Sequence, residues 1–391
     1  MSGRRIGHLV VAAVIVASLS GSAHALERYR AMWALGDGLS DDGNLWNDCT
    51  GRTEPPVALG YDRGRYSDGP VWVERLAEII GLDPDDDNDF TDLAFGGAYT
   101  NLYNRNISPF DQEPATCRGE TGMLAQAAEA SVSSLESRDL VTLLAGANDY
   151  FAWLQADEPS VQADMSCVGQ GLGPLDGNGA PSSANIARCA ALVVGDIAKG
   201  IAELHDGGAR NFIIGNLPHL GNTPEGRKQG PQAAELLNEI VEAHNRTLAA
   251  AIGILGETYR DARFTLLDLS ALFDAFLAKP GRFGLTNITV PCLTPGITGQ
   301  RIPTKVCADG QSGRTLFWDP IHPTRRIHDL TAVYAATTMA ADRILPKGLN
   351  HRQARINARA LWVTGIYATY GRIFLRMAPH QLISLLAMRG R

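Results

Sequence analysis

Short apolar runs alternate along the chain with segments in which apolar residues recur every three to four positions. Five runs have the length and composition of buried strands: 29–35, 92–95, 140–145, 211–215 and 264–269. Helical periodicity predicts five helices, at 71–80, 123–135, 184–205, 231–255 and 326–341. Strands that alternate with helices favour a parallel sheet covered on both faces, so we predict a three-layer α/β/α fold.

The segment 71–80 carries the clearest helix signals. Asp68 is a suitable N-cap, Pro70 suits the first turn, and Gly81 is typical of the residue that follows a helix. We therefore expect this helix to begin directly after Pro70.

Glycine-containing blocks lie where three of the predicted strands end. Residues 36–44 read Gly-Asp-Gly-Leu-Ser-Asp-Asp-Gly-Asn and follow the first strand, residues 96–98 read Gly-Gly-Ala, and residues 146–149 read Gly-Ala-Asn-Asp. The carboxyl ends of parallel strands meet at one edge of a sheet, and ligands bind there. We therefore expect these three blocks to converge on one site.

A fourth block, Asp-Pro-Ile-His-Pro-Thr at 319–324, supplies acid–base chemistry. Asp319 can hold one tautomer of the His322 imidazole and stabilise its cation, which makes His322 a candidate general base. The Asn148 amide is a candidate donor to an oxyanion, and Gly96 and Gly97 each carry a backbone N–H that a ligand can approach closely. The structural alternatives are a surface His–Asp pair, a turn-forming Asn and a turn glycine.

In this order and spacing, the four blocks resemble the GDSL (SGNH) family of esterases and lipases. The resemblance covers roughly residues 29–342. It implies a flavodoxin-like parallel sheet and hydrolysis of carboxylic esters through an acyl-enzyme, without a metal or organic cofactor. By this resemblance Asp319 and His322 are catalytic, while Gly97, Asn148 and the backbone N–H of residue 38 form the oxyanion hole.

In that family the first block carries the nucleophilic serine, and this chain has Gly38 there. Three explanations are open: a natural loss of the nucleophile, a serine-to-glycine change peculiar to this copy of the sequence, or a different nucleophile such as Ser40. The main prediction is an ester hydrolase of weak or absent activity, a possible pseudoenzyme. The alternative is an inactive extracellular protein that binds acylated glycans or lipids.

The N-terminus predicts export. Two arginines precede an apolar stretch at 9–19, and Ala-His-Ala at 23–25 is typical of a signal-peptide cleavage site, so we assign residues 1–25 to a signal peptide. A membrane anchor is the alternative. The six cysteines all follow residue 25, and an even number in a secreted or periplasmic protein favours disulfides. Sequence alone leaves 15 pairings open; our working hypothesis is sequential pairing, with Cys292–Cys307 the most local.

The charge is distributed unevenly. Residues 343–391 hold nine Lys and Arg and no Asp or Glu, which leaves the remainder near −16. An acidic body argues against nucleic acid as a partner, while the resemblance to the GDSL family implies a small-molecule, lipid or glycan ester as the substrate. We therefore divide the chain into a hydrolase domain at 26–345 and a basic extension at 346–391. Arginines and aromatic residues at 349–391 suit an anionic membrane surface, and a poorly ordered tail is the alternative.

Overall fold

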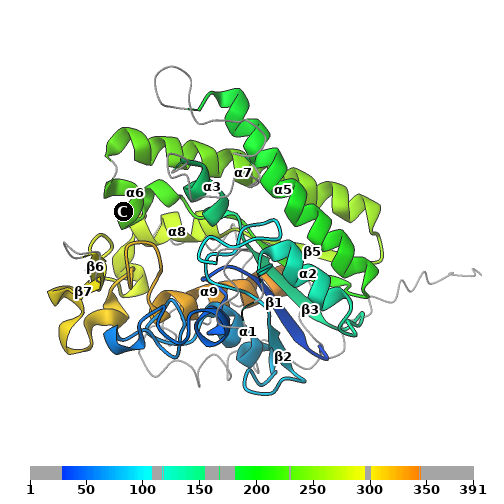
Figure 1. Cartoon of the computed structure of the whole chain (residues 1–391), viewed down its shortest axis with the longest axis horizontal. Helices are drawn as coiled ribbons and strands as arrows, with labels where there is room; N and C mark the ends of the chain where they lie inside the picture. Colours follow the sequence, from blue (N-terminus) through cyan, green and yellow to red (C-terminus); the bar gives the residue numbers. More distant parts are fainter. Residues whose placement is uncertain are drawn as a thin grey trace, which may run out of the picture.

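A parallel sheet lies at the centre of the protein, in a computed structural model that describes residues 29–107, 117, 119–154, 167, 181–228, 230–295, 301–342 and 344. The strand order is β2-β1-β3-β4-β5 (Figure 1). The strands are β1 (Met32–Gly36), β2 (Phe90–Asp92), β3 (Leu140–Leu144), β4 (Asn211–Gly215) and β5 (Arg263–Leu267). This sheet, with helices on both faces, confirms the predicted three-layer α/β/α fold.

The second strand is displaced from its prediction. β2 ends at Asp92, where the predicted run 92–95 begins. The Asp92 carboxylate accepts the Ala94 N–H at 2.7 Å, which turns the chain locally. Leu93 and Phe95 nevertheless donate to β1 carbonyls at 2.8 and 3.1 Å. The predicted run therefore continues the same pairing in an irregular form.

The principal helices are α1 (Trp72–Ile80), α2 (Met123–Ser131), α3 (Ala147–Leu154), α5 (Ser183–Asp206), α7 (Pro231–Thr258), α8 (Leu269–Ala278) and α9 (Arg325–Ala341). Shorter helical segments are η1 (Leu45–Cys49), η2 (Val57–Leu59), η3 (Leu220–Asn222), α6 (Pro224–Lys228), η4 (Pro280–Phe283) and η5 (Lys305–Arg314). The five predicted helices are all present, whereas α3 and α8 follow strands too closely to show separate periodicity. Within the described residues, none of the helices combines the length and apolar character needed to cross a bilayer.

Successive residues of each strand enter different cores. Trp33 and Leu35 of β1 pack in a cluster with α2, α5 and α7, while Met32 and Ala34 pack in the cluster that contains α1 and α9. Figure 1 shows α5 and α7 on one side of the sheet and α1 and α9 on the other. Both faces of the central strands β1, β3 and β4 are thus buried, which explains their largely apolar sequences.

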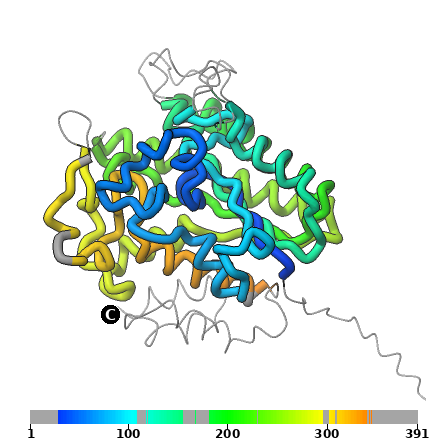
Figure 2. The backbone as a smooth tube through the Cα atoms, turned by 60° about the horizontal axis from the view of Figure 1, so that its bottom comes forward, coloured from blue at the N-terminus to red at the C-terminus, as the bar shows by residue number. Residues whose placement is uncertain are grey.

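Helix α1 does not begin as its sequence suggested. Its N-cap is Val71, whose N–H donates to the Glu74 carboxylate at 2.8 Å. Asp68 instead accepts the N–H of Arg325, the first residue of α9, at 2.6 Å. Because α1 and α9 pack side by side (Figure 2), a residue just before α1 can reach the start of α9. The predicted cap of α1 was therefore wrong.

Three disulfides join Cys49 to Cys117, Cys167 to Cys189, and Cys292 to Cys307. This is the sequential pairing of our working hypothesis. The last bond fixes a two-stranded hairpin of β6 (Leu293–Pro295) and β7 (Arg301–Pro303) to η5. The predicted signal peptide and the basic extension lie outside the described residues.

Candidate active site

The carboxyl ends of β1, β2 and β3 meet at a cavity of about 320 Å³. Gly36, the last residue of β1, allows the strands to approach closely. It has φ of +144°, and a Cβ there would lie 2.1 Å from the Leu144 carbonyl oxygen. The chain leaves β1 in a tight turn, in which the N–H groups of Ser40 and Asp41 donate to the Asp37 carbonyl at 2.9 and 3.0 Å. This turn places position 38 in the cavity wall.

Gly38 faces the imidazole of His322. A Cβ built on Gly38 lies 3.3 Å from His322 Nε2 and 3.1 Å from Tyr66 Cδ2. The backbone of Gly38 is outside the left-handed region, so an ordinary side chain is compatible with it. A small shift of the Tyr66 ring gives that side chain its room.

Ser40 does not replace the missing serine in this arrangement. Its side chain is fully buried, and its Oγ accepts a hydrogen bond from Trp72 Nε1 at 3.2 Å. Ser40 is also absent from the residues that line the cavity. The geometry therefore disfavours Ser40 as the nucleophile.

Asp319 and His322 form a directed pair. His322 Nδ1 lies 2.8 Å from Asp319 Oδ2, and Asp319 Oδ1 accepts the backbone N–H groups of Ile321 and His322 at 2.9 and 2.7 Å. Tyr61 Oη donates to Asp319 Oδ2 at 2.7 Å. Burial alone would raise the pKa of Asp319, but the charge of His322 and these hydrogen bonds outweigh it and hold the pKa at about 2. The Asp319 carboxylate is thus ionised, and it orients the imidazole of His322 so that Nε2 faces Gly38.

The two candidate oxyanion glycines differ in the use of their N–H groups. Gly96 N–H donates to Asp41 Oδ2 at 2.6 Å, whereas Gly97 N–H has no partner among the described residues and Gly97 lines the cavity. Gly97 has φ of +86°, and a Cβ there would lie 2.5 Å from Asn106 Nδ2. Of the two, Gly97 is the available donor, and its conformation requires glycine.

Asn148 lies in the first turn of α3 and also lines the cavity. Its Nδ2 donates one hydrogen to the Ala98 carbonyl at 3.1 Å, which fixes the amide and leaves a second hydrogen to donate. The structure therefore brings together all five residues singled out in the sequence: Gly38, Gly97, Asn148, Asp319 and His322.

Several residues around the site had no sequence signal of their own. Tyr66 stacks on the His322 ring with centroids 4.6 Å apart. Asp41 is fully buried and accepts backbone N–H groups from Gly43 at 2.7 Å and Asn44 at 2.6 Å, as well as that of Gly96. Asp41 thereby ties the first block to the second. In the sequence, the only indication of this role was that Gly43 and Asn44 follow Asp41 by two and three residues.

Asp37 is a buried carboxylate in the cavity wall. Burial raises its pKa to about 6, against the opposing effects of the Leu39 N–H and the charge of His322. His219 and His244 do not line the cavity: His219 pairs with Asp274 at 3.0 Å and His244 with Tyr150 at 2.8 Å.

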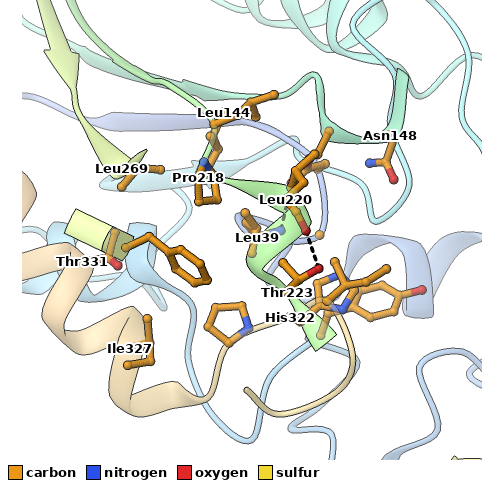
Figure 3. Close-up of a pocket in the computed structure, with 18 of the residues that line it drawn as sticks. Leu39, Leu144, Asn148, Pro218, Leu220, Thr223, Leu269, His322, Ile327 and Thr331 are labelled. Carbon is orange, nitrogen blue, oxygen red and sulfur yellow. Dashed lines mark hydrogen bonds between the residues drawn. The ribbon is translucent and has the colours of Figure 1, made fainter. Parts of the chain in front are cut away.

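Apolar side chains form most of the remaining wall. They come from α8, from the segment after β4, from the segment before α9 and from the first turn of α9: Leu217, Leu220, Leu269, Leu272, Phe273, Phe276, Phe317, Ile321 and Ile327. In Figure 3, Leu269 and Thr331 lie on one side of the cavity and Asn148 on the other. The cavity thus joins a polar end to an apolar end.

The similarity of this chain to known proteins covers all five strands of the sheet. Residues 32–334 match the family described as GDSL-like Lipase/Acylhydrolase. A GDSL esterase/lipase of Arabidopsis thaliana is 22% identical over 83% of this chain and 85% of its own length. A phosphatidylcholine-sterol acyltransferase of Aeromonas hydrophila is 25% identical over 78% and 88%. A thermolabile hemolysin of Vibrio parahaemolyticus is 25% identical over 76% and 61%.

Proposed function

The chain belongs to the GDSL-like lipase/acylhydrolase family, and from this we propose a carboxylic ester hydrolase whose catalytic groups are complete except for the nucleophilic oxygen at position 38. The observation that carries the proposal is the 3.3 Å between a Cβ at position 38 and His322 Nε2. One further atom on that Cβ would be within hydrogen-bond reach of the imidazole.

His322 acts as the general base in this mechanism. Asp319 accepts from Nδ1, which leaves Nε2 free to take a proton, and it stabilises the imidazolium that follows. The carbonyl oxygen of the ester, as it becomes an oxyanion, receives hydrogen bonds from the N–H groups of Gly38 and Gly97 and from Asn148 Nδ2. His322 then returns the proton to the leaving alcohol.

With glycine at position 38, water replaces the serine as the nucleophile. A water molecule between His322 Nε2 and the ester carbonyl gives up its proton to the imidazole as its oxygen attacks, so no acyl-enzyme forms. Triad enzymes without a catalytic residue retain roughly 10³–10⁴-fold rate enhancement from the oxyanion hole and binding. We therefore expect slow direct hydrolysis.

The apolar wall favours esters with an apolar acyl or alcohol portion. The polar end of the cavity holds the ester group, and the apolar side chains of α8 cover the hydrocarbon. The relatives include a protein named for its action on phosphatidylcholine and sterol, which is consistent with a lipid substrate here. Residues 349–391 remain a proposed membrane contact.

We also propose that the protein acts outside the cytoplasm. The leader-like sequence at 1–25 and three disulfides in the folded domain support this location, because disulfides persist in oxidising compartments. Mass determination of the protein recovered from the periplasm or medium should give a chain that begins near Leu26. A full-length chain confined to the cytoplasm would contradict the proposal.

The test of the hydrolase is Gly38→Ser, with Gly38→Ala as its matched control. Serine adds Cβ and oxygen, whereas alanine adds Cβ alone. We expect the serine variant to hydrolyse p-nitrophenyl esters rapidly and to react with a serine-directed phosphonate. The alanine variant should show at most slow direct hydrolysis and no reaction with the phosphonate. A folded serine variant that is inert toward short and long acyl esters and toward the phosphonate would overturn the proposal and favour an inactive binding protein.

A further inference from the structure

Helix α9 contributes a polar pair to the apolar end of the cavity. Ile327, His328 and Thr331 of this helix line the cavity, together with residues of α8. His328 and Thr331 are three residues apart and therefore share one face of the helix. Neither takes part in the mechanism above.

His328 is a neutral donor in this wall. Its Nδ1 accepts the Trp72 backbone N–H at 3.2 Å, so the proton of the neutral ring is on Nε2. Burial, helped by the charge of His322, lowers the pKa of His328 to about 3. The Nε2–H is buried and has no acceptor among the described residues. Leaving such a donor unpaired costs about 1–3 kcal/mol.

Thr331 differs from the other threonines toward the C-terminal end of α9. Thr337 and Thr338 donate their hydroxyls to carbonyls one turn back, at 2.8 and 3.0 Å. The hydroxyl of Thr331 makes no such bond and has no partner among the described residues, although only 9% of the residue is exposed. Thr331 lies across the cavity from Asn148 in Figure 3, away from the oxyanion donors.

We propose that His328 and Thr331 recognise an oxygen substituent, a hydroxyl or a carbonyl, on the apolar portion of the ligand. The ligand oxygen accepts from His328 Nε2–H and forms a hydrogen bond with the Thr331 hydroxyl. This inference rests on the proposed function and narrows its substrate class from plain aliphatic esters to oxygenated ones. A purely apolar ligand would leave both groups unpaired in a dry wall, which is the costlier arrangement.

Ligand binding tests the pair without any need for turnover. The full chain is titrated with decanoate and with hydroxydecanoates that carry the hydroxyl at successive positions. At least one isomer should bind about tenfold more tightly than decanoate, the value of one well-placed hydrogen bond. His328→Phe should remove this preference and Thr331→Val should reduce it. His328→Asn, which can still accept from Trp72, serves if the phenylalanine variant fails to fold.

His244→Phe is the matched control. His244 is also fully buried, with its pKa lowered to about 3 by burial and with an unpartnered Nε2 among the described residues, but it does not line the cavity. The preference should persist in that variant. Equal affinity for decanoate and every isomer, or a preference that survives in the folded His328 variants, would overturn the inference.

Activity separates this inference from the proposed function. If the Gly38→Ser chain hydrolyses decanoyl and hydroxydecanoyl esters with equal kcat/KM, the hydrolase stands and the polar pair has no recognition role. If that chain hydrolyses neither ester while the binding preference remains, the hydrolase fails and the recognition of oxygenated ligands stands.

Discussion

Gly97 and Gly38 lie in the wall of one cavity, on segments that follow neighbouring strands, but their backbones differ. At Gly97 the chain is left-handed, and a Cβ would meet Asn106 Nδ2 at 2.5 Å. At Gly38 the chain adopts an ordinary conformation, and a Cβ would have its nearest neighbours at 3.1 Å or more. Glycine is thus a requirement of the backbone at position 97. At position 38 the surroundings suit a larger residue, with the base already in place.

Removal of the base gives the largest expected effect. In the Gly38→Ser background, His322→Ala should abolish the restored turnover, a loss on the order of 10⁶ in kcat, because the new hydroxyl needs a proton acceptor. His219→Ala is the control, since His219 is paired with Asp274 outside the cavity. Ester turnover that survives His322→Ala would mean that position 38 works with a different base.

The next effect concerns the orientation of that base. Asp319→Asn in the Gly38→Ser background should lower kcat by about 10⁴-fold, the size of the equivalent change in a serine protease, because the amide favours the wrong tautomer of His322. Steady-state kinetics with p-nitrophenyl butyrate measure the change. A loss below about tenfold would show that the Asp319–His322 pair is structural rather than catalytic.

Much of this site was readable from the sequence because its parts are local. Asp319 and His322 lie three residues apart in one turn, and Gly97 and Asn148 follow buried strands whose apolar runs predict a parallel sheet. Such a sheet brings the carboxyl ends of its strands to one edge, however the helices pack against it. The fold and the convergence of these segments therefore required only short-range patterns and one topological rule, whereas the roles of Gly38 and Gly97 came from the resemblance to the GDSL family.

The parts that could not be predicted depend on contacts between distant segments. Tyr61 reaches Asp319 across 258 positions, and Asp68 caps a helix that begins 257 positions later. No local pattern marks either partner, because each bond exists only after the chain has closed around the sheet. The unpartnered hydroxyl of Thr331 belongs to the same class, since the sequence of α9 does not reveal the cavity beside it.

Alanine substitutions at Gly97 and Gly38 test the difference between the two backbone conformations directly. Gly97→Ala should reduce the free energy of unfolding by about 1–3 kcal/mol, because alanine must adopt a left-handed φ against Asn106. Gly38→Ala should change it by less than about 1 kcal/mol, since its φ is ordinary. In the Gly38→Ser background, Gly97→Ala should also lower kcat by about 10²–10³-fold through displacement of one oxyanion donor.

Urea unfolding and ester turnover measure the two effects. Equal stability losses at positions 38 and 97 would contradict the difference between the two backbones. Full activity in the Gly97→Ala, Gly38→Ser double variant would remove Gly97 from the oxyanion hole.

The smallest expected effect is a change with pH in the free energy of unfolding. It tests the Asp319–His322 pair in the chain that has Gly38. The folded pKa of Asp319, about 2, lies below the ordinary value of 3.8, so its ionised form stabilises the fold above about pH 4, and this stabilisation is lost as the pH falls toward 2. The unfolding free energy of the chain with Gly38 should exceed that of its Asp319→Asn variant by about 2 kcal/mol near pH 6, and the difference should shrink on acidification.

Asp149→Asn is the control of opposite sign. Burial raises the pKa of Asp149 to about 7. Asp149 therefore favours folding below about pH 4, and this contribution is lost as the pH rises through 7. A difference between the chain and Asp319→Asn that does not change with pH would mean that the folded protein does not lower the pKa of Asp319.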